Sequence, residues 1–242
     1  HRDLHSFPTR RSSDLAPVAK QIVERANLSR DQFLPLFEAL GVVGGDEEGI
    51  TKALHAARQP DAEGAKKRRA IREAIELKHY EFNAHGVEHN QRYQSASVIP
   101  DGTTETTHRD RELFGHPTSR PGAKLPHAWL VDPNGRRIST LDLVGKGRFS
   151  VLTGLAGTPW ADAADTLAQE LGLALRGVVI DRDAHDVYGE WSRRAEIDEE
   201  GVLLIRPDGY VAWRRPSGAA DITEATRLLR EALTAVLCRP AL

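Results

Sequence analysis

The 242-residue sequence contains no methionine and only one cysteine, Cys238. Without a second cysteine, an intrachain disulfide framework and a dithiol redox centre are both excluded. Without methionine, the chain has no ordinary translation start, so we expect it to be a fragment of a longer protein. The scarcity of thiols also fits a reducing compartment, and we expect a cytoplasmic protein.

An excess of charge and long apolar runs are also missing. The net charge is −2 at pH 7, whereas nucleic-acid-binding proteins usually carry a strongly basic face. No apolar run approaches the ~20 residues that a membrane-spanning helix needs. With 40% hydrophobic and 28% charged residues, the composition is typical of a globular protein of one or two domains. We therefore expect neither nucleic acid nor a membrane as a partner.

The first fifteen residues do not look native. Residues 5–15 (HSFPTRRSSDL) resemble the translation of a sequencing-adapter oligonucleotide. The alternative, a genuine disordered arm or transit peptide rich in Arg and Ser, has no apolar segment or helical face to support it. Residues 1–15 are therefore set aside from the reasoning about the fold.

Four helices are expected next, because apolar residues recur there at helical spacing. Ser29 is expected to cap the second helix, Gly41 to end it, and Asp61 to cap the fourth. The predicted helices cover residues 16–26, 29–40, 47–58 and 61–80, and Ile50, Ala53, Leu54 and Ala57 are expected to face inward in the third. Together with a strand predicted at 91–99 by loose alternation, they form a helical region over residues 16–100.

Residues 101–130 are polar and rich in turns, and we interpret them as an ordered connector, with a free linker as the alternative. Within them, His127 lies between Pro126 and Trp129, and we interpret it as a packed rather than a catalytic histidine. Upstream, the basic run at residues 66–69 suggests an anion site. The simpler interpretation is a solvated helical face, because acidic residues at helical spacing flank the run.

His79, His85 and His89 are close together in the sequence and suggest a metal cluster. Gly86 weakens any helical i, i+4 pairing of the last two, and no Cys or second carboxylate motif completes a site. We therefore expect no metal site there.

The second half predicts a thioredoxin-like domain over residues 131–242. A half-buried strand at 137–144 comes first. Further strands are expected at 148–154, 175–180, 202–206 and 210–214, with helices at 158–171, 187–194 and 222–237. Thr158 is expected to cap the first of these helices, with Pro159 as its first residue, and Asp221 to cap the last. From residue 148 on, this is the order β-α-β-α-β-β-α, in which one parallel unit joins an antiparallel hairpin. The fold class is therefore α/β.

Redox-active members of that fold carry Cys-x-x-Cys at the start of the helix after the first strand, where the helix dipole lowers the thiol pKa. Here Ala156-Gly157-Thr158-Pro159-Trp160 occupies the position, and Cys238 lies at the other end of the domain. We therefore expect a redox-silent domain.

Four blocks together resemble one family. Residues 86–102, 121–130 (PGAKLPHAWL), 139–154 (STLDLVGKGRFSVLTG) and 202–214 follow one another in the order found in flavin-dependent aromatic hydroxylases of the phenol and 2,4-dichlorophenol monooxygenase group. In those enzymes, the blocks span the junction between a FAD and substrate part and a C-terminal thioredoxin-like domain. The resemblance covers nearly the whole chain after residue 16.

The resemblance implies a parent enzyme that uses FAD, NADPH and O2 to hydroxylate phenols, chlorophenols foremost, at the position ortho to the hydroxyl group. It also implies a homodimer. No Gly-x-Gly-x-x-Gly turn or flavin-ribose motif is present, so we assign no catalytic, cofactor-binding or metal residue to this chain. The isolated chain is expected to be inactive. The alternative is a stand-alone structural or dimerisation module built on a redox-silent thioredoxin-like fold.

Overall fold

The computed structural model describes residues 8–44, 46–106 and 109–238. Residues 1–7 of the segment set aside, Gly45, Thr107 and His108 of the predicted connector, and residues 239–242 lie outside them. The chain divides into a helical unit, within residues 15–88 and 108–115, and a second unit, within residues 1–14, 89–107 and 116–242, which is named the C-terminal unit. The boundary between residues 88 and 89 falls inside one short helix.

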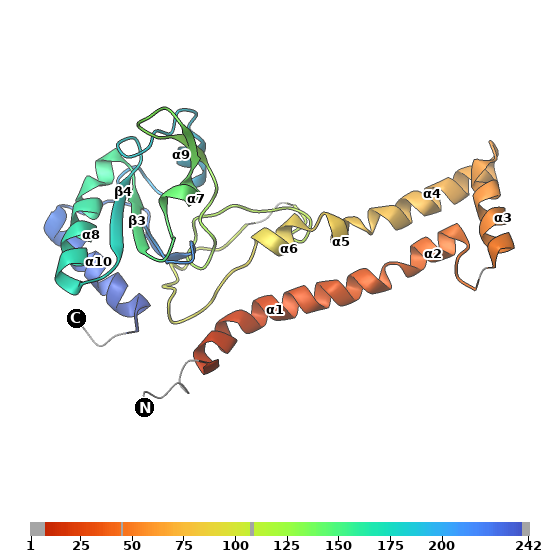
Figure 1. Ribbon diagram of the computed structural model, residues 1–242, viewed down its shortest axis with the longest axis horizontal. Helices are drawn as coiled ribbons and strands as arrows, with labels where there is room; N and C mark the ends of the chain where they lie inside the picture. The colour runs from red at the N-terminus through yellow and green to blue at the C-terminus, as the bar shows by residue number, and fades with distance from the viewer. Residues whose placement is uncertain (1–7, 45, 107–108, 239–242) are drawn as a thin grey trace. The chain divides into compact units, whose positions relative to one another are not determined.

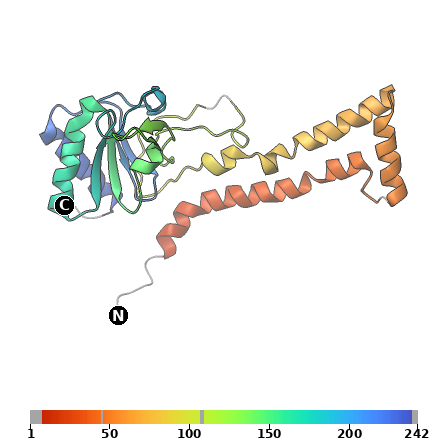
Figure 2. The same cartoon turned by 45° about the horizontal axis from the view of Figure 1, so that its top comes forward.

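The helical unit is built from consecutive helices, and in both ribbon views α1 and α2 run beside α4 and α5 (Figures 1 and 2). The six helices are α1 (Pro8–Asp31), α2 (Leu34–Leu40), α3 (Glu47–Arg58), α4 (Ala62–Glu76), α5 (His79–Phe82) and α6 (His85–His89). Gly41 ends α2 in the left-handed conformation with φ 72°, as predicted. The Asp61 side chain caps α4 by accepting a hydrogen bond from the Gly64 amide at 2.7 Å, also as predicted.

One prediction in this unit is wrong and another holds only in part. Ser29 is not a cap: it lies inside α1, where its hydroxyl accepts a hydrogen bond from Arg25 Nε at 3.3 Å. Of the inward face predicted for α3, Ile50, Ala53 and Ala57 are half-buried, whereas Leu54 is 40% exposed. The helical period of the sequence marks the apolar face, but no residue of α3 is fully buried.

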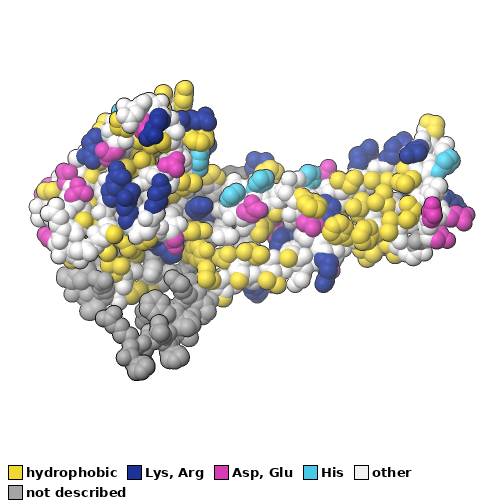
Figure 3. Space-filling view, viewed as in Figure 1, with side chains coloured by type: hydrophobic (Ala, Val, Ile, Leu, Met, Phe, Trp, Pro, Cys, Tyr) yellow, Lys and Arg dark blue, Asp and Glu magenta, His cyan; other side chains and the backbone are white. Residues whose placement is uncertain are grey.

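The helical unit buries few large apolar side chains. Beside Val18, Ala39, Ala74 and Val87, its buried residues include Arg25, Ser29 and Lys78, which are 7%, 5% and 6% exposed. Its large exposed apolar side chains are Leu15, Ile22, Val23, Leu28, Leu34, Phe37, Val42, Val43, Leu54, Ile75, Phe82 and Phe114. Apolar side chains accordingly gather on the surface over these helices (Figure 3). Such an extended apolar surface is typical of a face that another protein surface covers.

The C-terminal unit contains a four-stranded sheet in the order β4-β3-β5-β6. The strands are β3 (Phe149–Thr153), β4 (Leu175–Val179), β5 (Val202–Ile205) and β6 (Val211–Arg215). β3 and β4 are parallel, whereas β3 with β5 and β5 with β6 are antiparallel. This is the predicted thioredoxin-like arrangement, and it confirms the α/β fold class.

Both faces of this sheet are covered. Helices α8 (Thr158–Leu171) and α10 (Ile222–Val236) pack on one face, and α9 (Glu190–Arg194) lies on the other (Figure 1). Neighbouring strand residues point to opposite faces: Val151 belongs to the α8 and α10 side, and Leu152 to the α9 side. Gly177 on β4 permits the close approach of α8, because a Cβ atom there would lie 2.7 Å from Ala161 Cα.

Three predictions differ from the structure here. Residues 91–99 form no strand; only Arg92 makes an isolated bridge, to Ala123. The segment 137–144 is a strand, β2 (Arg137–Ser139), only at its start. It pairs with β1 (Trp129–Val131), and a capping box of Ser139 and Asp142 then begins helix α7 (Thr140–Leu143).

The helix predicted at 158–171 has the predicted bounds, but its cap is Gly157 rather than Thr158. Asp221 caps the final helix through the Glu224 amide, as predicted. No helix in the described parts of the chain combines the length and apolarity needed to cross a membrane.

Candidate functional site

The densest polar network of the C-terminal unit surrounds Arg214 on β6. Its Nε donates to Asp101 Oδ2 at 2.7 Å, and its Nη2 donates to Thr103 Oγ1 at 3.0 Å. Its Nη1 donates to Glu196 Oε2 at 2.8 Å and to Ser119 Oγ at 3.2 Å. Only 7% of Arg214 is exposed, so a buried charge is matched by two carboxylates and two hydroxyls. The network ties the segment around residues 101–103 to the sheet.

Asp101, one of the two acids of this network, is held in its charged form. Burial alone would raise the pKa of Asp101, but hydrogen bonds from Thr103 and the Arg214 guanidinium lower that pKa below the ordinary 3.8. Asp101 is therefore ionised at neutral pH and is not poised to give or take a proton there.

A cavity of about 700 Å³ lies beside this network, lined by residues including Tyr93, Ser95, Asp101 and Arg120. Tyr93 packs edge-on against Tyr210, with ring centroids 4.6 Å apart. Burial first, and then the neighbouring Tyr93 hydroxyl, raise the pKa of Tyr210 to about 12. Tyr210 therefore stays protonated near neutral pH. The region around the cavity is suited to packing or binding rather than to acid–base catalysis.

The Arg214 network was not predicted from the sequence. Asp101 and Thr103 fell in the predicted connector, and Arg214 at the end of a predicted strand. Val211, Ala212 and Arg214 of β6 are all buried, so a charge occupies a buried position of an otherwise apolar strand. A buried arginine requires acidic or hydroxyl partners elsewhere in the chain.

At the position where redox thioredoxins hold their dithiol, this domain is closed by hydroxyl and indole contacts. Thr153 Oγ1 at the end of β3 donates to the Gly201 carbonyl at 2.6 Å, and Trp160 Nε1 donates to the Glu200 carbonyl at 3.0 Å. A Cβ atom on Gly157 would lie 1.7 Å from Thr153 Oγ1. The turn is therefore fully packed. It carries no thiol, since the one cysteine, Cys238, is exposed near the C-terminus.

Two candidates raised by the sequence are structural. His127 packs edge-on against Trp129 at 4.6 Å, and its carbonyl accepts a hydrogen bond from Arg194 at 2.5 Å. In the basic run, Arg68 donates at 2.8 Å to the carbonyl oxygens of both Ala57 and Gln59. At least this cation therefore closes the turn between α3 and α4 instead of awaiting an anion.

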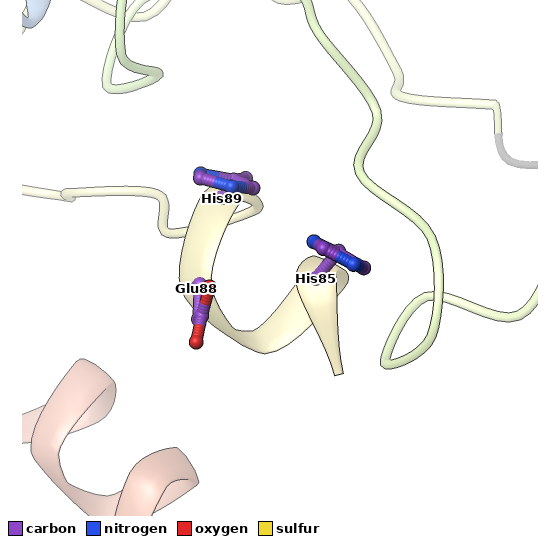
Figure 4. Close-up of side chains that lie close together, drawn as sticks. All are labelled: His85, Glu88 and His89. Atoms are coloured by element: carbon purple, nitrogen blue, oxygen red, sulfur yellow. The ribbon is translucent and has the colours of Figure 1, made fainter. Parts of the chain in front are cut away.

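The three histidines considered for metal binding separate into two groups. His79 pairs with Glu76 at 3.3 Å and contacts Asn83 at 2.7 Å. His85 and His89 lie on helix α6 together with Glu88, and the ligand atoms of these three residues all lie within 4.8 Å of one another (Figure 4). Two premises of the sequence argument against a metal were therefore wrong, because Gly86 does not interrupt the helix and Glu88 supplies a carboxylate.

The glycines do not form a cradle for a dinucleotide. Gly41 is needed because a Cβ atom there would lie 2.8 Å from the Ala53 Cβ, which is a contact with a protein helix rather than with a phosphate. The element before it is the helix α2, whereas a dinucleotide turn follows a strand. The described residues contain no Gly-x-Gly-x-x-Gly turn after a strand, so they offer no site of that kind for the FAD pyrophosphate.

Comparison with known proteins settles the family. The family described as "Aromatic-ring hydroxylase, C-terminal" matches residues 118–240, about half of the chain. The chain belongs to this family. It is 46% identical over 207 residues to 2,4-dichlorophenol 6-monooxygenase of Delftia acidovorans, covering 84% of the chain and 35% of that relative. It is 43% identical over 215 residues to phenol 2-monooxygenase of Pseudomonas sp. (strain EST1001), covering 87% of the chain and 35% of that relative.

Among solved structures, the chain is similar to the flavin-dependent monooxygenase PieE in complex with FAD and substrate. The TM-score is 0.82 at 39% identity, and the match covers 93% of this chain and 38% of that one. The chain thus spans about a third of the length of the relatives it matches. The residues matched by the family, 118–240, include Arg214 and the thiol-free turn, whereas Asp101, Thr103 and most residues that line the cavity precede the matched range.

Proposed function

We propose that this chain is the C-terminal part of a flavin-dependent monooxygenase. The whole enzyme uses FAD, NADPH and O2 to hydroxylate phenols ortho to the hydroxyl group, with chlorophenols as the foremost substrates. One observation carries the proposal: 84% of the chain aligns at 46% identity with a 2,4-dichlorophenol 6-monooxygenase, while covering 35% of it. The relative contains a long segment that this chain does not match.

The helical unit supports the same proposal through its surface. A unit with buried Arg25 and Lys78 and an apolar exterior cannot derive its stability from its own core. In the proposed enzyme, the flavin- and substrate-binding part covers that exterior. The glycine-rich FAD turn and the phenol-contacting groups belong to that part, since the described residues provide neither.

Within the proposed enzyme, the C-terminal domain has a structural role. Its packed, thiol-free turn excludes dithiol exchange, and neither the pKa of Asp101 nor that of Tyr210 lies near neutrality. We further propose that the enzyme is a cytoplasmic homodimer and that it does not bind membranes. Nucleic acid is not a proposed partner either, because the net charge of this chain is only −2.

The proposal is tested with two proteins expressed side by side. One is the present chain, and the other is the gene extended upstream in frame. The extended protein is expected to carry bound flavin, visible as yellow absorbance, and to oxidise NADPH when 2,4-dichlorophenol is added. The present chain is expected to bind little FAD and to show no turnover. Product analysis should find the added oxygen ortho to the hydroxyl group.

Two results would overturn the proposal. One is stoichiometric flavin on the present chain. The other is a native start codon immediately before Ala16, together with a protein that is stable on its own, which would favour a stand-alone structural or dimerisation module. The upstream reading frame separates these cases, because a strand followed by Gly-x-Gly-x-x-Gly is expected only for the enzyme.

A further inference from the structure

Helix α6 is held in place from one side by backbone contacts. The amides of Gly86 and Val87 both donate to the Glu112 carbonyl, at 2.9 and 3.3 Å. A Cβ atom on Gly86 would lie 1.9 Å from the Arg111 carbonyl oxygen, so only glycine allows this approach. Gly86 and Val87 are the buried residues of the helix. The orientation of the helical turn is therefore fixed before any ligand binds.

The other residues of that turn are its donors. His85, Glu88 and His89 occupy positions i, i+3 and i+4 of α6, and all three are exposed. Residues at this spacing are neighbours on a helix surface. Each offers one ligand atom, and these atoms lie within 4.8 Å of one another, on side chains that all project from the same short helix (Figure 4).

We propose that His85, Glu88 and His89 form a site for a divalent transition metal, with Zn²⁺ as the preferred ion. Two imidazoles and one carboxylate are a donor set that zinc takes in proteins, and three protein ligands leave the fourth position to water. In a tetrahedral site with bonds of about 2.1 Å, the ligand atoms lie roughly 3.4 Å apart. Exposed side chains reach that separation by small rotations, without moving the helix.

The preference for Zn²⁺ follows from the donors. Imidazole nitrogen suits zinc, copper and nickel, whereas Mg²⁺ and Ca²⁺ are bound mainly by oxygen ligands. With a single carboxylate, the site offers too few oxygen atoms for Mg²⁺ or Ca²⁺. The site is independent of the proposed flavin chemistry, because it uses no residue of the Arg214 network or the adjoining cavity.

Metal binding is measured on the full chain by calorimetric titration with ZnCl₂ and by visible absorption with CoCl₂. We expect one high-affinity equivalent per chain and a Co²⁺ spectrum of low coordination number. Replacing an outer-shell group typically costs about 10–100-fold in metal affinity, so loss of a ligand in His85→Asn or His89→Asn should cost at least as much. Glu88→Gln keeps the shape, removes the charge and should weaken binding less.

His79→Asn is the matched control. His79 is a nearby exposed histidine that already pairs with Glu76, and its replacement should leave the Zn²⁺ affinity unchanged. All other histidines remain in every variant, so they contribute the same background. Circular dichroism melting curves of the four variants should coincide without metal, because each altered side chain is exposed.

Four results would each overturn the proposal. The first is no high-affinity equivalent in the parent chain. The second is an undiminished equivalent in the double variant His85→Asn, His89→Asn. The third is an equal loss in His79→Asn. Binding of Mg²⁺ in place of Zn²⁺ would also contradict it, because it would indicate an oxygen-ligand site elsewhere.

Discussion

The two units of this chain differ in the largest side chains that they bury. In the C-terminal unit, strand residues such as Leu203 and Leu204 are fully buried on the two faces of the sheet. In the helical unit, the most protected large side chains are cationic. Arg25 donates to Glu112 at 2.8 Å and to Gln32 at 2.7 Å, and the Lys78 ammonium donates to the Ser29 carbonyl at 3.0 Å.

The two units therefore differ in the source of their stability. Apolar burial is the main favourable term in folding, so the C-terminal unit has its own source of stability. The helical unit uses polar contacts to set its helix positions and leaves apolar area outside. The Lys78 ammonium also lies 3.3 Å from the centroid of the Phe33 ring, a cation–π contact that joins the residue before α5 to the residue before α2.

The largest expected effect is a cavity in the sheet. Leu203→Ala removes a fully buried side chain and should lower the free energy of unfolding by about 2–5 kcal/mol. The matched control is Leu54→Ala in α3, at a side chain that is 40% exposed, for which we expect a change within about 0.5 kcal/mol. Urea unfolding followed by circular dichroism measures both, and equal losses would contradict the comparison.

A glycine pair should give changes of opposite sign. Gly177→Ala places a methyl group 2.7 Å from the Ala161 Cα, and overpacking of this kind costs about 1–3 kcal/mol. Gly49→Ala lies in helix α3, where its Cβ meets nothing closer than 3.5 Å. It should stabilise that helix by about 0.5–1 kcal/mol. Thermal melts of the two variants compare them, and destabilisation by both would show that the helical unit is packed as tightly as the sheet.

The smallest effect concerns Asp101 and depends on pH. Its folded-state pKa lies below 3.8, so its stabilisation is fully present above that pH and is lost as the pH falls through the folded-state value. Asp101→Asn keeps hydrogen-bonding shape but removes the charge, and should cost about 1 kcal/mol at pH 7. The difference in the free energy of unfolding between the parent and Asp101→Asn should then decrease below about pH 4.

Asp110→Asn is the control in the helical unit. The Tyr80 hydroxyl, followed by backbone amides, also lowers the pKa of Asp110, but its side chain is exposed. Its replacement should therefore change the stability at pH 7 less than Asp101→Asn does. Urea unfolding between pH 3 and pH 7 measures the loss of unfolding free energy in both variants. A loss in Asp101→Asn that increased as the pH fell would contradict the pH dependence assigned to Asp101.

Much of the C-terminal unit could be predicted from the sequence, because its local and tertiary signals agree. The bounds of α8 were predicted from an apolar stripe that follows Pro159, and the structure gives the same bounds. Predictions that rested on a local sequence pattern alone were wrong at residues 91–99 and at Ser29. Residues 91–99 alternate like a strand but find no neighbouring strand, and the helical period around Ser29 continues through a residue that resembles a cap.

The polar sites were less predictable, because they depend on residues far apart in the sequence or on the local conformation of one turn. Nothing near Asp101 indicates Arg214 as its partner. The cluster on α6 was missed for a different reason: a glycine between two histidines was taken to interrupt a helix. The packing of Gly86 against residues 111 and 114 makes that glycine a requirement of the helix position instead.

The link between Asp101 and Arg214 also has a kinetic consequence. The two residues are 113 positions apart, so their contact closes one of the longest loops in the chain. Closing such a loop costs entropy, and the contact with Arg214 can offset this cost only after the sheet has formed. We therefore expect the segment around residue 101 to lock onto the sheet after the folding transition state. In stopped-flow refolding, Asp101→Asn should accelerate unfolding and leave the folding rate almost unchanged.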